Sequence, residues 1–155
     1  MNMLKAIAAS AVLVMPVAAA AQNVVAKTGD SVAGFFKDEG AKVEVTTDSV
    51  GDPNLKVEYY GNDFSVYYYG CDGNINCDAI QFYSGYQTDG GVRLAKINEW
   101  NRENRFARGY VSEEGSARIE MDVFLGSEGM SPDDFAQTVG IWTRRMAEFE
   151  EFIDW

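Results

Sequence analysis

The sequence contains no histidine, and only two cysteines occur among its 155 residues. Without histidine, the Ser-His and Cys-His pairs that activate most nucleophiles cannot form. A zinc site would need both cysteines together with carboxylates, which is a rare set of ligands. The phosphate-binding pattern GxxxxGK[ST] and the dinucleotide fingerprint GxGxxG are also missing. We therefore predict that the protein binds no metal and no cofactor.

Paired carboxylates, as in glycosidases, are the remaining route to catalysis. Glu120 and Asp122 alternate on one predicted strand and so share a face, while Glu58 lies on another strand. Charged residues that alternate along a strand are far more often a solvated face than a catalytic pair. We predict that the protein is not an enzyme and has no catalytic residues, and a carboxylate-dependent hydrolase is the most distant alternative.

Basic residues are also scarce, because 13 lysines and arginines stand against 24 aspartates and glutamates. The formal net charge of −11 disfavours binding to nucleic acid and to anionic membranes, since both are polyanions. We predict that the protein has no nucleic-acid partner.

The first 21 residues have the three-part layout of a secretory signal peptide. A single Lys5 precedes an apolar run that ends in small residues at Ala21, with cleavage after Ala21 or Ala20. The run is rich in alanine, contains Pro16 and is shorter than the roughly 20 strongly apolar residues of a spanning helix. We predict a bacterial periplasmic or secreted protein with no stable membrane anchor after cleavage. A flexible segment would follow at residues 22–29, and a single domain at residues 30–155.

Export favours a disulfide between Cys71 and Cys77, because the periplasm is oxidising. A catalytic dithiol normally has two intervening residues at a helix N-terminus, whereas here five residues separate the cysteines in a predicted hairpin. If the cysteines face each other across that hairpin, Tyr68 lies opposite Ile80, which is an apolar pair suited to a buried face. The preceding hairpin, with a two-residue turn at Gly61-Asn62, selects the same face independently. That turn pairs Tyr59 with Phe64, Val57 with Val66 and Leu55 with Tyr68.

The remaining periodicity predicts a two-layer domain. A short helix follows the capping residues Asp30 and Ser31, four strands of an antiparallel meander occupy residues 42–86, and a second helix lies within residues 92–104. Residues 106–125 form another hairpin, and a long helix begins at Ser131 and Pro132. Its apolar stripe consists of Phe135, Val139, Trp142, Met146, Phe149 and Ile153. We predict an α+β fold, a two-layer sandwich in which an antiparallel sheet of five or six strands carries helices packed on one face.

The register of the 106–125 hairpin stays open at this point. A two-residue turn near Glu114-Gly115 directs Phe106, Arg108 and Tyr110 toward the core side of the sheet. A three-residue turn with a bulge directs Ala107, Gly109 and Val111 there instead.

Three segments carry a family likeness, and they read FSVYYYGCDGNINCDAIQFYSGY, LAKINEWNRENRFARGYVSEEGSARIEMDVFL and SPDDFAQTVGIWTRRMAEFEEF. Over most of the mature chain they resemble the YbjN family, described as bacterial sensory transduction regulators. The most distinctive block is INEWNRENRFARGY. The resemblance implies a fold like that of type III secretion chaperones, an α+β two-layer sandwich. It also implies a regulatory or protein-binding role, with no catalytic residues to carry over.

Two surfaces are candidate partner-binding sites. Tyr67, Tyr69 and Tyr83 point away from the helix-covered face beside Lys56, and tyrosine offers a large contact area with a polar tip. The alternative is that this strip is covered within the domain or in a homodimer. A local concentration of positive charge is the second surface, and its basic residues are Arg93, Lys96, Arg102, Arg105, Arg108 and Arg118.

Asn98, Asn101 and Asn104 could add hydrogen bonds to this basic region. The alternative is that its arginines pair with acidic residues of the last helix. From these surfaces we predict a non-enzymatic periplasmic module of the YbjN type that binds another envelope protein or acts as a regulator. The contacts would come from the tyrosines or from Asn98, Asn101, Arg102, Arg105 and Arg108. A periplasmic protein that binds a small ligand or a carbohydrate is the alternative.

Overall fold

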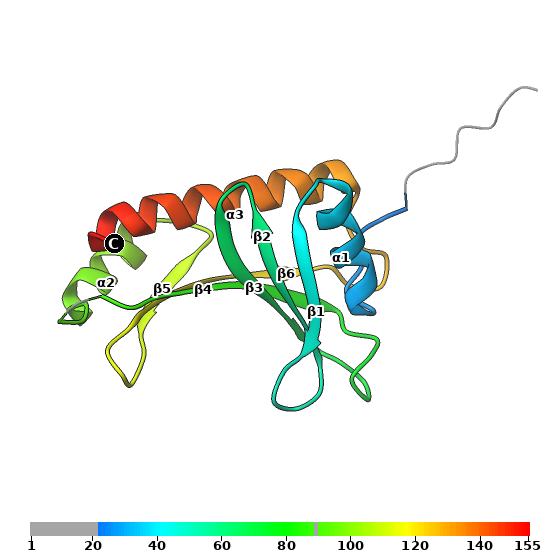
Figure 1. The fold of residues 1–155 in the computed structure, drawn as a ribbon, viewed down its shortest axis with the longest axis horizontal. Coiled ribbons are helices and arrows are strands. Elements are labelled where there is room, and N and C mark those ends of the chain that lie inside the picture. Colours follow the sequence, from blue (N-terminus) through cyan, green and yellow to red (C-terminus); the bar gives the residue numbers. More distant parts are fainter. Residues whose placement is uncertain (1–21, 89) are drawn as a thin grey trace, which may run out of the picture.

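The computed structural model describes residues 22–88 and 90–155, so the predicted signal peptide at residues 1–21 lies outside the described residues. One antiparallel sheet carries three helices on one face, with α3 lying along the sheet between α1 and α2 (Figure 1). This arrangement confirms the predicted α+β class. Within the described ranges, no helix has both the length and the apolar character needed to cross a membrane.

The elements follow one another in the predicted order of helix, four strands, helix, two strands and long helix. Their bounds are α1 Gly29–Asp38, β1 Lys42–Thr47, β2 Pro53–Tyr59, β3 Asn62–Tyr69, β4 Ala79–Tyr86, α2 Leu94–Glu103, β5 Arg108–Val111, β6 Ala117–Phe124 and α3 Pro132–Ile153. The strand order in the sheet is β1-β2-β3-β4-β6-β5. The last hairpin therefore adds to the meander through β6, and β5 becomes an edge strand.

The long helix α3 begins as its sequence predicts. Ser131 is the N-cap, and its side-chain oxygen accepts a hydrogen bond from the backbone N–H of Asp134 at 3.2 Å. All six residues of the predicted apolar stripe are buried. Helix α1 begins three residues earlier than expected, at Gly29, and the hydroxyl of Ser31 accepts a hydrogen bond from the N–H of Val25 instead of capping the helix.

The core between the helices and the sheet is built from aromatic rings. Phe82 of β4 and Trp142 of α3 stack with ring centroids 5.7 Å apart and planes 18° from parallel. Phe36 of α1 meets Phe82 edge-on at 6.4 Å. All three side chains are fully buried, and each such ring stabilises the fold by about 2 to 3 kcal/mol through burial alone.

The turn between β2 and β3 differs from the prediction by one position. Its two central residues are Tyr60 and Gly61, with φ angles of 47° and 81°, and two positive φ values are typical of a type I′ hairpin turn. Asn62 then pairs with Tyr59 and donates a side-chain hydrogen bond to the Tyr59 carbonyl at 3.1 Å. The predicted Gly61-Asn62 turn is therefore wrong. The register shifts by two residues, and an even shift keeps the same side chains in the core.

The register between β3 and β4 is confirmed, since Val66 lies opposite Phe82 and Tyr68 lies opposite Ile80. The predicted disulfide joins Cys71 and Cys77 in the connecting loop. This loop also holds its neighbours: the backbone N–H of Asn76 donates to the Lys27 carbonyl at 2.7 Å, and the Asn74 amide donates to Asp52 at 2.8 Å.

The segment before α1, predicted to be flexible over residues 22–29, is instead packed against the domain. Val24 and Met130 exchange two backbone hydrogen bonds of 2.8 and 3.0 Å. Val24 and Ala26 are buried. The burial of Val24 and Ala26 and the backbone pairing with Met130 therefore hold this segment against the domain.

The hairpin of β5 and β6 follows the second of the two predicted registers. Ser112 donates to the Ser116 carbonyl at 2.9 Å around a three-residue loop, and Gly115 in that loop has a φ of +85°. Gly109 consequently lies opposite Ile119 and faces the core. A Cβ atom at Gly109 would lie 3.0 Å from the ring of Phe149, so a glycine lets α3 approach the edge strand closely.

Candidate binding surface

The face of the sheet that points away from the three helices is called the open face here. Side chains alternate along each strand, so every second residue of the sheet lies on this face. One row of cross-strand neighbours runs over all six strands. It consists of Glu44, Lys56, Ser65, Tyr83, Glu120 and Arg108.

The predicted tyrosine strip, Tyr67, Tyr69 and Tyr83, lies on the open face. The rings of Tyr67 and Tyr83 meet at right angles, with centroids 5.5 Å apart. Partial burial raises the pKa of all three phenols above the usual value for tyrosine. Tyr110 of β5 lies beside Tyr83 and extends the strip. Sequence reasoning missed Tyr110 because the register of its hairpin was open.

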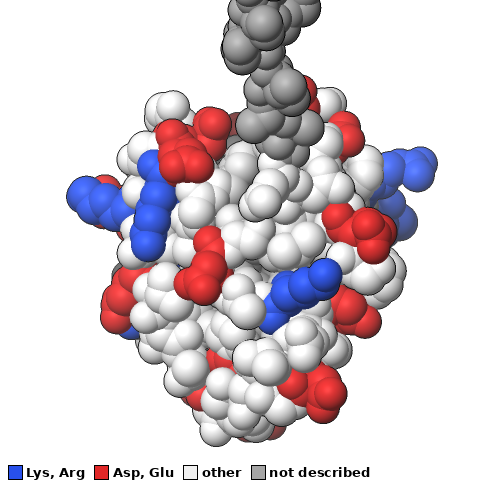
Figure 2. All heavy atoms as spheres, turned by 90° about the vertical axis from the view of Figure 1, so that its right-hand side faces the viewer, with Lys and Arg blue, Asp and Glu red and all other residues white. Residues whose placement is uncertain are grey.

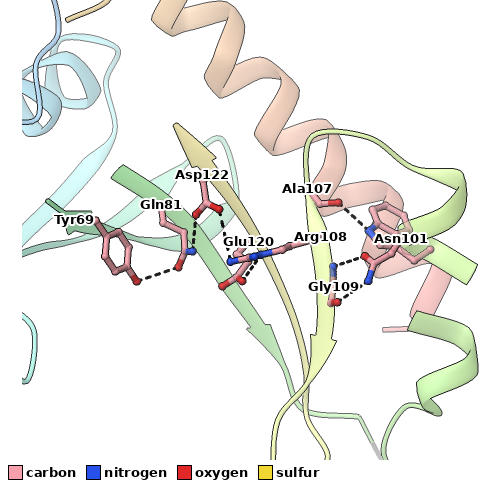
Figure 3. Close-up of polar contacts among 9 residues, drawn as sticks. Tyr69, Gln81, Asn101, Ala107, Arg108, Gly109, Glu120 and Asp122 are labelled. Carbon is pink, nitrogen blue, oxygen red and sulfur yellow. Dashed lines mark hydrogen bonds and ion pairs between the residues drawn. The ribbon is translucent and has the colours of Figure 1, made fainter. Parts of the chain in front are cut away.

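Polar side chains on the open face form a continuous chain of contacts (Figure 3). The Tyr69 hydroxyl donates to Gln81 at 3.4 Å, and the Gln81 amide donates to Asp122 at 2.7 Å. Arg108 donates from Nε to Glu120 at 2.6 Å, and its Nη2 lies 3.6 Å from Asp122. Gln81 and Glu120 are buried although both are polar. This series of side-chain contacts therefore fixes one end of the tyrosine strip to the edge strand β5.

This arrangement decides between two interpretations of the carboxylates on β6. Glu120 and Asp122 share a face, as predicted, but both contact the same guanidinium of Arg108. The single positive charge of this guanidinium offsets one of the two negative charges, and its contacts hold both acids in place. Glu58 lies on the open face at the other side of the sheet, where it pairs with Lys42 at 2.8 Å. The geometry favours a fixed polar surface for hydrogen bonding.

Asn101, predicted as a partner-binding residue, is used within the fold. Its amide nitrogen donates to the Gly109 carbonyl at 3.0 Å, and its amide oxygen accepts from the Gly109 N–H at 2.8 Å (Figure 3). Gly109 lies on the edge strand β5, where a backbone N–H and a carbonyl would otherwise be free to pair with another strand. Asn101 therefore occupies part of this sheet edge and joins α2 to β5.

The other residues of the predicted basic region separate in space. Asn98 is exposed on α2, and Arg102 pairs with its neighbour Glu103 at 3.0 Å. Arg108 joins the open face, whereas Arg105 borders a hollow beside α3. Lys96 contacts Asp154 just beyond α3 at 2.6 Å. The predicted pairing of arginines from this region with acids of the last helix is not among the ion pairs of the described residues.

An open hollow of about 560 Å³ lies at the β1 side of the open face. Two ion pairs border it, Lys42 with Glu58 at 2.8 Å and Lys56 with Glu44 at 3.3 Å, and Tyr83 forms another part of its wall. Within residues 22–88 and 90–155, no group of three or more acids or cysteines is placed to hold a metal ion.

The end of the molecule that carries α1 is seen in Figure 2. Acidic and basic side chains are scattered over this end, in places next to one another, and uncharged surface occupies its centre. The basic residues predicted to act together, Arg102, Arg105 and Arg108, belong to or follow α2 at the opposite end of the sheet (Figure 1). These three arginines therefore lie away from the end that Figure 2 shows.

A comparison with protein families gives one match. The model of the YbjN family, described as "Putative bacterial sensory transduction regulator", matches residues 28–155. The match covers all three helices and all six strands. No curated protein matches the chain with significant similarity.

Proposed function

This chain belongs to the YbjN family, and on that premise we propose that it is a non-enzymatic regulatory module that binds a protein partner in the periplasm. The family supports the regulatory role. Binding of an envelope protein through the open face is the specific part of the proposal. The tyrosine strip and its fixed polar neighbours are the observation that carries it.

The open face has the properties of a contact surface that is ordered before binding. Tyr69 is 48% exposed, yet its hydroxyl is held by Gln81. Tyr67 and Tyr83 hold each other through their rings. Side chains ordered in advance lose little conformational entropy when a partner binds. Tyrosine and arginine are also enriched among the residues that dominate protein interfaces, and Arg108 adjoins the strip.

The periplasmic location rests on two independent features. The signal-peptide pattern of residues 1–21 directs export, and the Cys71–Cys77 disulfide suits an oxidising compartment. The disulfide also holds the loop that contacts Lys27 and Asp52, so its oxidation state matters for the packing of this end.

Site-specific photo-crosslinking tests this proposal. Single tyrosines of the full chain are replaced by benzoylphenylalanine in bacterial cells, at Tyr69 and Tyr83 on the open face. Tyr60, which is 82% exposed at the β2–β3 turn, is the matched control. We expect discrete protein adducts in the periplasmic fraction from positions 69 and 83 and none from position 60. Equal adducts at all three positions, or none at any, would contradict a partner site on the open face.

The intact mass of the same periplasmic protein tests the location separately. We expect residues 1–21 to be absent and the mass to rise by two hydrogens after reduction of Cys71 and Cys77. A retained N-terminus or two free thiols would argue against export. Because the mass does not depend on the adducts, the partner site and the location can fail independently.

A further inference from the structure

A second surface lies where the loop between α2 and β5 meets α3. Arg105, Phe106, Ile141, Arg144 and Arg145 border a hollow of about 270 Å³ there, and we call these five residues the arginine corner. Glu103 also borders the hollow, and its carboxylate pairs with Arg102 at 3.0 Å. Three guanidinium groups thus lie around one aromatic and one aliphatic side chain. The protein as a whole has a net charge of −11, so the local charge is opposite to that of the rest of the chain.

Phe106 is held in an unusual position. Its φ angle is +73°, in the left-handed region that bulky residues rarely adopt, and 69% of its surface is exposed. A backbone of this kind costs about 1 to 2 kcal/mol, and burial of the ring does not repay that cost here. The exposed ring therefore has no evident role in the stability of the domain.

The three arginines differ in how they are held. Arg145 is mostly buried, donates to the Asn104 side chain at 3.2 Å and pairs with Glu148. Asn104 in turn donates to the Trp100 carbonyl at 3.2 Å, which ties Arg145 to the end of α2. Arg105 and Arg144 are exposed, and the ion pairs found in the described part of the chain involve neither of them.

We propose that the arginine corner binds an acidic segment of a partner protein that also carries an apolar side chain. Carboxylates of that segment pair with Arg105 and Arg144, because guanidinium groups bind carboxylates in a two-pronged geometry. The apolar side chain packs on Phe106 and Ile141. The guanidinium of Arg145, which already pairs with Glu148, forms a fixed part of the wall, so the positive charge offered to a partner comes from Arg105 and Arg144.

This inference deepens the proposed function and rests on it for the nature of the occupant. Phe106 also borders a second hollow of about 270 Å³, whose walls include Arg108, Glu120 and Asp122 of the open face. The ring of Phe106 thus lies between the arginine corner and the polar contacts of Arg108, Glu120 and Asp122, which lead to the tyrosine strip. A partner seated on the open face could extend an acidic segment past Phe106 into the arginine corner.

The test measures binding of the mature chain, residues 22–155, to fluorescein-labelled peptides by fluorescence anisotropy. The probe is an eight-residue peptide of alternating glutamate and leucine, and its partner control alternates glutamate and serine at the same charge. We expect the leucine-containing peptide to bind at least tenfold more tightly than the serine-containing one, and binding to weaken as salt rises. Equal binding of the two peptides would overturn the proposal, because it would show only a general attraction of anions.

Variants localise the binding. We expect the double substitution Arg105→Ala and Arg144→Ala to weaken binding of the leucine-containing peptide about tenfold or more, through the lost charge-assisted hydrogen bonds. Arg93→Ala is the matched control, since Arg93 is an exposed arginine of the same region that borders a different hollow. A loss of affinity with Arg93→Ala as large as that of the double variant would overturn the proposal.

Phe106→Gly separates binding from folding. Glycine adopts a positive φ freely, so we expect this variant to have an unchanged or higher melting temperature and yet to bind the peptide several-fold more weakly. A variant that binds normally would show that the ring has no part in the site.

Other occupants are distinct outcomes of the same assay. Release of the labelled peptide by millimolar inorganic phosphate, or preferential binding of the protein to phosphatidylglycerol vesicles, would overturn the proposal in favour of a phosphate or lipid ligand. Self-association in sedimentation that the Arg105→Ala and Arg144→Ala substitutions abolish would point to a second copy of the chain. Failure of the peptide assay alongside positive crosslinks at Tyr69 would reject the arginine corner and leave the open-face site intact.

Discussion

Three consecutive tyrosines show how differently the two faces of the sheet are built. Tyr68 points to the helices and is 1% exposed, whereas its neighbours Tyr67 and Tyr69 lie on the open face. The same side chain therefore serves as core on one face and as surface on the other. The alternation of a strand, and not the residue type, decides which role a tyrosine takes.

The two faces also differ in what holds their side chains. The covered face is held by ring packing, as between Phe82 and Trp142, and any change of volume there disturbs several neighbours. The open face is held by ion pairs and single hydrogen bonds, and exposed pairs such as Lys42 with Glu58 contribute little to stability because water screens them. The open face can therefore change its side chains at little cost in stability, which suits a surface that binds partners.

The largest expected effect comes from the covered face. Trp142→Ala would empty the centre of the aromatic core and should lower the free energy of unfolding by about 3 to 5 kcal/mol. Urea denaturation followed by circular dichroism measures this change. Phe124→Ala on the open face is the control, because Phe124 is 74% exposed and its loss should cost less than about 0.5 kcal/mol. Similar losses for the two variants would remove the distinction between the faces.

The covered face was largely predictable from the sequence. Its residues repeat at intervals of two along strands and of three or four along helices, so the stripe of α3 follows from periodicity alone. The β3–β4 register followed from supposing that Cys71 and Cys77 face each other, and the alternation of apolar residues agreed with it. The tyrosine strip was predictable for the same reason, because residues that alternate with core residues must lie on the other face.

Features that depend on single backbone angles or on distant contacts were not predictable. Tyr60 lies in a turn that needs positive φ, a position for which the sequence pattern favoured Gly61-Asn62. The position of Arg105 beside α3 depends on the extended backbone of Asn104, which ends α2 and which the spacing of side chains does not reveal. The internal use of Asn101 depends on the register of β5, which the sequence left open.

A smaller effect is expected from the polar chain on the open face. Glu120→Ala should lower the free energy of unfolding by about 1 to 2 kcal/mol, because it removes the buried carboxylate that Arg108 contacts at 2.6 Å. Asp122→Ala is the comparison, since its carboxylate is exposed and lies 3.6 Å from the same guanidinium. It should cost less than about 1 kcal/mol. Urea denaturation of both variants ranks them, and a larger loss for Asp122→Ala would show that burial of Glu120 is not what matters.

The smallest expected effect compares Tyr68 with Tyr69 in alkaline solution. Burial raises the pKa of the Tyr68 phenol strongly, and partial burial raises that of Tyr69. A phenol whose pKa is higher in the folded state stabilises the fold fully below its unfolded value of about 10, and this stability is lost as the pH rises through the folded pKa. At pH 10.5 we therefore expect Tyr68 to destabilise the fold by about 0.5 to 1 kcal/mol relative to pH 8, and Tyr69 to do so less.

Tyr68→Phe and Tyr69→Phe measure these two contributions. Phenylalanine cannot ionise, so Tyr68→Phe should reduce the drop in melting temperature between pH 8 and pH 10.5, and Tyr69→Phe should reduce it less. At pH 8 both variants should lie within a few tenths of a kcal/mol of the original protein, because the Tyr68 hydroxyl makes only a 3.5 Å contact with the Gly29 carbonyl. An equal effect of the two substitutions at pH 10.5 would mean that the faces differ in position but not in how strongly they exclude the charged form of tyrosine.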